Sequence, residues 1–194
     1  MSAGRERAGR PRRADARRNY DELVEQAKIA FAEFGVDASL DEIARRAGVA
    51  SGTLYRHFPA RSDLVEAVLG EQIAELVELG RALLATGDEF DAVATWLRAA
   101  IRHGLTYRGL AATVMNSALS HGKDLVSAWH AEMYNVGGAL LARAREARAI
   151  DADARDADVL KMIGAIAWAA QDDPDSADRL LAIVLNGLRY GLRA

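Results

Sequence analysis

The sequence predicts an all-α fold, and three observations support this prediction. Apolar residues recur at intervals of three and four along most of the 194 residues, which is the spacing of one face of a helix. Residues that favour helix starts and stops stand at the ends of several of these runs. No segment alternates apolar and polar residues in the β-branched pattern of a strand. We therefore expect amphipathic helices joined by short connections.

The first third of the chain predicts four helices in close succession. Gly35 supplies a left-handed stop for the first of them. Ser39 and Glu42 have the capping-box spacing of a helix start, and Gly48 ends the short helix that follows. Pro59 ends the next helix, because the residue before a proline is disfavoured in helical backbone. The predicted helices span residues 20–34, 40–47, 51–58 and 62–81.

The rest of the chain predicts five further amphipathic helices, separated by connections rich in glycine and aspartate. Gly137 and Gly138 lie inside one of them, where they predict a kink or a close contact with another helix. The predicted helices span residues 89–107, 109–118, 123–148, 156–170 and 174–192.

The composition excludes several classes of protein. The absence of cysteine excludes a disulfide scaffold, a thiol nucleophile and an iron–sulfur cluster. The four histidines lack the spacing of a metal site, and no glycine-rich phosphate loop follows a strand. We therefore expect no metal, no cofactor and no enzymatic activity. No apolar stretch approaches the roughly 20 residues of a membrane span, and no secretory signal is evident, so we expect a cytoplasmic protein.

Charge is distributed unevenly along the chain, although the net charge is only -3. Residues 1–61 hold 12 basic and 9 acidic side chains. Seven of the 12 basic side chains are arginines within the first 18 residues. A block of this kind is typical of an arm that binds a polyanion, although a solvated tail without a partner gives the same pattern. The predicted organisation is a basic flexible arm over 1–18, a helix–turn–helix domain over 19–61 and a larger helical domain over 62–194.

The short helix at 51–58 has an outward surface that suits a DNA groove. Its apolar residues Leu54 and Phe58 are expected to face inward, together with Val49 of the preceding turn. The remaining side chains include a small residue for close approach, hydroxyls and a permanent positive charge. An ordinary surface helix is the alternative, but such helices are usually rich in Glu and Lys, which are absent here. The outward residues are Ser51, Gly52, Thr53, Tyr55, Arg56 and His57.

These residues carry a resemblance to the DNA-binding module of TetR-family transcriptional regulators. Its most specific features are the Gly48-Val49 turn, the run from Thr53 to Phe58 and a basic residue before the next helix. The resemblance begins near Tyr20 and covers about the first 65–70 residues. Beyond that point the chain matches the family only in its helical character.

The resemblance implies a homodimer that places one recognition helix of each subunit in a major groove of palindromic DNA. It implies base contacts from Ser51, Gly52 and Tyr55, and phosphate contacts from Ser39, Thr53, Arg56, His57 and Arg61. An arm carrying Arg10, Arg12 and Arg13 would reach the adjacent minor groove. Ala50 departs from the family, in which Ser or Thr often caps this helix; if Ser51 caps it instead, its base contact is in doubt.

Two apolar stripes in the second domain suit either a plain core or a cavity for an apolar molecule. They lie on the helices predicted at 89–107 and 123–148 and include aromatic residues with polar tips. Because family members usually hold an effector in this domain, the resemblance favours a cavity. The candidate pocket residues are Trp96, His103, Met115, Asn116, Trp129 and Met133.

The last two predicted helices alternate small and large apolar residues, which permits close helix contact across a symmetric interface. Packing within one subunit is the alternative. The family favours a dimer interface of four helices, two from each subunit. The candidate interface residues are Val159, Met162, Ile163, Ile166, Leu180, Val184, Gly187, Leu188 and Gly191.

The sequence therefore predicts a ligand-responsive, DNA-binding transcriptional regulator, most simply a homodimeric repressor released from its operator by a small molecule. A helical carrier or enzyme without a role on DNA and a constitutive architectural DNA-binding protein are the alternatives. The identity of the effector, the operator sequence, the regulated genes and the sense of regulation are not encoded in any pattern recognised in the sequence.

Overall fold

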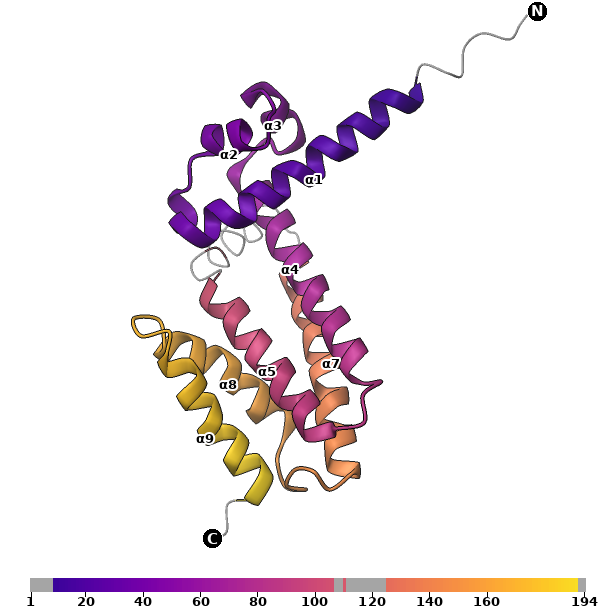
Figure 1. Cartoon of the computed structure of the whole chain (residues 1–194), viewed down its shortest axis with the longest axis vertical. Helices are drawn as coiled ribbons and strands as arrows, with labels where there is room; N and C mark the ends of the chain where they lie inside the picture. The colour runs from indigo at the N-terminus through magenta and orange to yellow at the C-terminus, as the bar shows by residue number, and fades with distance from the viewer. Residues whose placement is uncertain (1–8, 107–109, 111–124, 192–194) are drawn as a thin grey trace, which may run out of the picture. The chain divides into compact units, whose positions relative to one another are not determined.

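The computed structural model describes residues 9–106, Leu110 and 125–191, with side chains described from residue 14 onward and, in the last of these ranges, from residue 131. All regular structure in these ranges is helical, which confirms the predicted all-α fold (Figure 1). The elements are α1 (Gly9–Phe34), the 3-10 helix η1 (Gly35–Asp37), α2 (Leu40–Arg46), α3 (Ser51–His57), α4 (Arg61–Leu83), α5 (Glu89–Thr106), α7 (Leu125–Glu146), α8 (Asp156–Ala169) and α9 (Ser176–Tyr190).

The chain divides into two compact units, and α4 belongs to both. Of the described residues, 9–69 and Leu110 belong to the first unit, and 70–106 and 125–191 belong to the second. The division falls inside α4, after Leu69, whereas the sequence predicted a domain boundary between residues 61 and 62. The helix predicted at 109–118 lies almost entirely outside the described residues.

The first unit is built by packing two seven-residue helices against α1. Isolated helices of this length are unstable in water, so α2 and α3 depend on the apolar side chains that they bury. The contacts run from α1 to α2 and from α2 to α3. The buried side chains include Leu23, Val24, Phe31, Ile43, Leu54, Phe58 and Leu64.

Helix α1 begins at Gly9, within the stretch 1–18 that the sequence predicted as a flexible arm. Arginine and alanine, which dominate this segment, are strong helix formers. Arg18 also pairs with Asp15 one turn earlier. Figure 1 shows this part of α1 extending away from α2 and α3. Residues 1–8 lie outside the described part of the chain.

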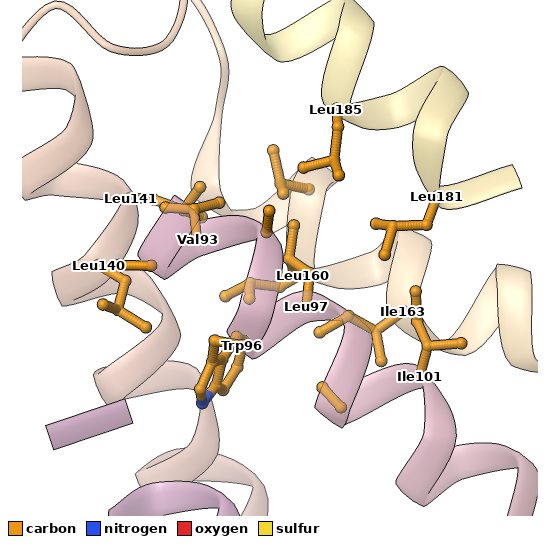
Figure 2. Packing of buried hydrophobic residues seen from close by; sticks show 14 of the residues in the cluster. Val93, Trp96, Leu97, Ile101, Leu140, Leu141, Leu160, Ile163, Leu181 and Leu185 are labelled. Atoms are coloured by element: carbon orange, nitrogen blue, oxygen red, sulfur yellow. The ribbon is translucent and has the colours of Figure 1, made fainter. Parts of the chain in front are cut away.

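Helix α5 contributes the central residues of the second unit's core, and it contacts α7, α8 and α9. Its buried side chains include Val93, Trp96, Leu97 and Ile101. Figure 2 shows these residues among leucine and isoleucine side chains from the neighbouring helices. The partners in this cluster include Leu140, Leu141, Leu160, Ile163, Leu181 and Leu185.

Trp96 is enclosed by two glycines on neighbouring helices. It is only 1 % exposed, and its Nε1 donates a hydrogen bond to the carbonyl of Leu76 at 3.1 Å. A Cβ atom on Gly137 of α7 would lie 2.6 Å from the indole ring, and one on Gly80 of α4 would lie 2.9 Å from Nε1. The close helix contact predicted at Gly137 is therefore confirmed. Trp96, which the sequence predicted as a pocket residue, is packed in the core of the second unit.

Two arginines of α7 bind backbone carbonyls in the connection between α4 and α5 and in the connection before α8. Arg143 donates to the carbonyls of Leu84 and Thr86 in the α4–α5 connection. Arg145 donates to the carbonyl of Ala154 at 2.9 Å and to the carboxylate of Asp156. The bond with Asp156 raises the pKa of Arg145 above its ordinary value. These side chains donate hydrogen bonds to backbone carbonyls that receive none from a helical amide.

We expect Gly137→Ala to destabilise the chain, because the added methyl group would overlap the ring of Trp96. Overpacking of this kind costs about 1–3 kcal/mol. The neighbouring Gly138→Ala is the control, since its Cβ would lie 3.7 Å from the nearest side-chain atom. Replacement of a glycine inside a helix by alanine stabilises the folded chain by about 0.5–1 kcal/mol. Urea unfolding of both variants would measure the difference, and equal midpoints would contradict the close packing.

Candidate nucleic-acid interface

The turn between α2 and α3 is set by one glycine in left-handed conformation. Gly48 has φ = +67°, a value that residues with a side chain rarely adopt. The amide of Val49 donates to the carbonyl of Ala44 at 3.0 Å, which closes the C-terminus of α2. The chain therefore leaves α2 in a fixed direction and enters α3 within three residues.

Helix α2 begins as the sequence predicted, but its first turn is bonded differently. Ser39 is the N-cap, and its hydroxyl accepts a hydrogen bond from the amide of Glu42 at 3.4 Å. The carboxylate of Glu42 accepts bonds from Arg45 at 2.6 and 2.7 Å and from Arg46 at 3.0 Å. These hydrogen bonds lower the pKa of Glu42 to about 2. Arg46 also lies 3.6 Å from Glu33 of α1, so the charged network joins the two helices.

Helix α3 divides cleanly into a buried and an outward side. Leu54 is buried, and Phe58, which follows the helix, is buried as well. Tyr55 is 47 % exposed, and Gly52 and Arg56 are exposed too. The remaining predicted contacts, Ser51, Thr53 and His57, are half-buried. The outward group predicted from the sequence is thus brought together on one short helix.

The N-terminus of α3 is capped by backbone alone. Ala50 occupies the N-cap and makes no side-chain hydrogen bond, while its carbonyl accepts from the amide of Thr53 at 2.7 Å. Ser51 is the first helical residue and does not replace the missing cap. A Cβ on Gly52 would meet nothing within 4 Å, so packing inside the chain does not require glycine there.

His57 is held by aromatic neighbours at the end of α3. Its ring meets Tyr20 of α1 edge-on at a centroid distance of 6.1 Å. Tyr20 also lies 5.0 Å from the ring of Phe58. These contacts tie the C-terminus of α3 to α1 and fix the orientation of the imidazole.

The structure places the remaining predicted DNA contacts in two regions. Arg61 is half-buried, and its Nη1 donates to the carbonyls of Val36 and Ala38, both at 2.7 Å. Arg10, Arg12 and Arg13 lie in the first turns of α1, where their side chains are outside the described part of the structure. Arg17 and Arg18 of the same helix are also exposed; they belong to the basic block of the first 18 residues but were not among the predicted DNA contacts.

Comparison with known proteins decides the family. A model described as "Bacterial regulatory proteins, tetR family" matches residues 23–68, and one described as "Transcriptional regulator SbtR-like, C-terminal domain" matches residues 88–190. The chain belongs to the TetR family of transcriptional regulators. Family membership makes it a DNA-binding regulator of transcription, and the family is not one of enzymes.

Solved structures support the same assignment. The TetR regulator SCO0520 from Streptomyces coelicolor is 34 % identical, with a TM-score of 0.75, and the match covers 89 % of this chain and 99 % of that one. A TetR regulator from Mycobacterium vanbaalenii is 32 % identical, with a TM-score of 0.67, and the match covers 91 % and 98 %.

Curated relatives match over the first unit. The uncharacterized HTH-type regulator TtgW from Pseudomonas putida is 38 % identical over 60 residues, which are 30 % of this chain and 45 % of the relative. The chain thus spans less than half the length of the curated relatives it matches first.

Three of the predicted pocket residues have described side chains in the second unit. Trp96 is in the core, whereas His103 is half-buried and Met133 is half-buried against the core. Met115 and Asn116 lie outside the described residues, and Trp129 is on α7 with its side chain undescribed. Within the described ranges, no group of three or more histidine or carboxylate side chains could hold a metal, and no helix could span a membrane.

The predicted interface residues on α8 and α9 fall into two groups. Val159, Ile163, Ile166 and Leu188 are buried in the core of their own chain and present little surface to a partner, which corrects their assignment. Met162 is exposed, and Leu180, Val184, Gly187 and Gly191 are half-buried. Trp168, Ile183 and Tyr190, which were not among the predicted interface residues, are 72 %, 68 % and 68 % exposed. Ile183 and Tyr190 share one stripe of α9 with the predicted Gly187, so the helical spacing could have indicated both.

We expect the charged network on α2 to make the free energy of unfolding depend on pH in the acidic range. The pKa of Glu42 is lower in the folded chain than its ordinary value of 4.5. Its ionised carboxylate therefore stabilises the folded chain fully above pH 4.5, and this stabilisation disappears as the pH falls toward about 2. Glu42→Gln should therefore lose less stability than the wild type between pH 4.5 and 2 in denaturant titrations. Glu22→Gln is the control, since the Glu22 carboxylate bonds the amide of Gln26. Parallel pH profiles for wild type and Glu42→Gln would contradict the network.

Proposed function

We propose that the protein is a homodimeric repressor that binds a palindromic operator and leaves it when a small molecule binds the second unit. One observation carries the DNA-binding part of this proposal. Helix α3 buries Leu54 and exposes Tyr55, Arg56 and Gly52 in a helix–turn–helix whose family regulates transcription. A role on chromosomal DNA also implies that the protein works in the cytoplasm.

The exposed side of α3 suits a division between base reading and phosphate binding. Tyr55 is large and outward, and Gly52 leaves the helix backbone accessible, so we assign both, with Ser51, to base edges. Arg56 carries a permanent charge, and the hydroxyl of Thr53 and the ring of His57 lie on the same short helix. We assign these three, and Ser39 at the N-terminus of α2, to phosphates, with Thr53 also able to touch a thymine methyl. The arginines at the start of α1 add positive charge, which we assign to the neighbouring groove.

The outer side of α8 and α9 suits contact with a second copy of the chain. Trp168, Ile183 and Tyr190 are more than two-thirds exposed, and Met162 adds a further apolar side chain. Gly164 and Gly187 have open space around them, so a partner helix could approach closely. Burying such side chains is favourable at about 25 cal/mol per Å². A two-fold dimer would also present two copies of α3, as a palindromic operator requires.

The effector is assigned to the second unit because ligand binding is typical of this family's second domain. His103 of α5 and Met133 of α7 are the half-buried candidates in the described residues, with Met115, Asn116 and Trp129 as further candidates. We propose that the effector displaces α4 and so changes the separation of the two α3 helices. Half-sites lie about 34–36 Å apart, so a change of a few ångströms weakens binding.

DNase footprinting of the DNA upstream of the protein's own gene tests the proposed function. The expected result is one protected palindrome whose half-sites lie about one helical turn apart. A thermal-shift screen of small molecules against the same protein would then identify compounds that stabilise it and release the DNA. Uniform weak binding to all DNA, without a protected site, would contradict the proposal.

We expect Tyr55→Ala to weaken specific binding while the fold remains intact. Tyr55 is exposed, so its truncation leaves no cavity, whereas the removal of one base contact costs about 1–3 kcal/mol, or about five- to 150-fold in affinity. Tyr134→Ala on α7 is the control, since that tyrosine is also exposed but lies off α3. Fluorescence anisotropy with operator and scrambled duplexes gives both affinities. Unchanged operator affinity would remove Tyr55 from the interface.

We expect Ile183→Glu to dissociate the proposed dimer, because a carboxylate would have to be buried in an apolar contact. Ala182→Glu adds the same charge at the preceding exposed position, about 100° around α9, and should leave the dimer intact. Sedimentation velocity measures the mass of each variant. A dimeric Ile183→Glu protein would place the interface elsewhere.

A further inference from the structure

Arg61 is the first residue of α4, and its side chain reaches back to the connection that precedes α2. Both hydrogen bonds from its Nη1 are 2.7 Å long, and they end on the carbonyls of Val36 and Ala38. Ala38 directly precedes Ser39, the N-cap of α2, and is itself buried. The contact therefore joins the start of α4 to the start of α2 across 23 and 25 residues of sequence.

The chemistry of the guanidinium makes this contact a strong tie. One terminal nitrogen of arginine carries two hydrogens, and here each donates to a different carbonyl. A cationic donor shared between carbonyls forms charge-assisted bonds, which are stronger than neutral ones. For Nη1 to bind a phosphate, it would have to leave both carbonyls.

A second, local contact closes the same turn of α4. The carboxylate of Asp63 accepts a hydrogen bond at 2.8 Å from the amide of Ala60, which lies in the α3–α4 connection. The Asp63 bond caps the first turn of α4 and so fixes the backbone that carries Arg61. The Arg61 bonds then hold this turn to the segment before α2.

We propose that Arg61 is a positioning residue that holds the α2–α3 pair in register with α4, and that it is not a phosphate ligand. This inference rests on the proposed binding of an operator. On this basis Arg61 acts on DNA through α2 and α3, and a displacement of α4 moves the start of α2 with it.

Two measurements on the same proteins test the inference. Hydrogen exchange of the free protein reports the connection at residues 35–40, and operator affinity over a range of salt concentrations reports the number of neutralised phosphates. The variants are Arg61→Met, which removes donors and charge, and Arg61→Lys, which keeps both. Arg56→Met is the matched control, because Arg56 is exposed on α3.

The expected pattern separates positioning from phosphate binding. Arg61→Met should speed exchange at residues 35–40 by about tenfold and weaken operator binding by about tenfold, which corresponds to about 1.4 kcal/mol, with an unchanged salt slope. Arg61→Lys should restore both values toward the wild type. Arg56→Met should leave exchange unchanged and reduce the salt slope by about 0.9 for each phosphate that Arg56 neutralises in the wild type.

A salt slope reduced in Arg61→Met as in Arg56→Met, with unchanged exchange, would overturn the inference. Should Arg61→Met fail to fold by circular dichroism, Arg61→Gln replaces it, since it also removes the charge and is too short to span both carbonyls. Wild-type protein that protects no DNA site would refute the proposed function instead, and the exchange result would still show whether Arg61 holds the connection.

Discussion

A seven-residue helix cannot persist alone in water, and the architecture of the first unit follows from that constraint. Helix α3 exists because Leu54 is buried, Phe58 ends it in the core and Tyr20 packs on its last residues. Once these contacts hold the inward side, the outward side is free of any packing duty. Tyr55 and Arg56 can therefore be selected for a partner without a cost in stability, which is how one short helix serves both folding and recognition.

Arginine plays a recurring structural role in this chain. Arg61 binds the connection before α2, Arg143 binds the connection between α4 and α5, and Arg145 binds the residues before α8. In each case a cationic side chain donates to backbone carbonyls in or beside a connection between α-helices. Backbone carbonyls outside the regular α-helical ladder need other donors. The arginine-rich composition thus has an internal use besides any attraction to DNA.

The sequence predicted the helices well because their signals are local. Gly48, for example, marks a left-handed turn that only its own backbone requires. It could not predict which apolar stripes face a cavity, since the glycines that enclose Trp96 lie on helices distant in sequence. For the same reason the inward turn of Arg61 was missed, because charge alone does not show where a side chain points. On α8 and α9, periodicity gave one apolar set, and only the fold separated buried Ile163 from exposed Ile183.

Helix α4 contributes residues to both units, and each of its ends makes close contacts within its own unit. Arg61 in its first turn bonds the carbonyls of Val36 and Ala38, and Gly80 in its last turns packs against Trp96 with no room for a methyl group. Because α4 takes part in both units, one helix is held by an arginine bonded to backbone carbonyls in the first unit and by packing against an aromatic ring in the second.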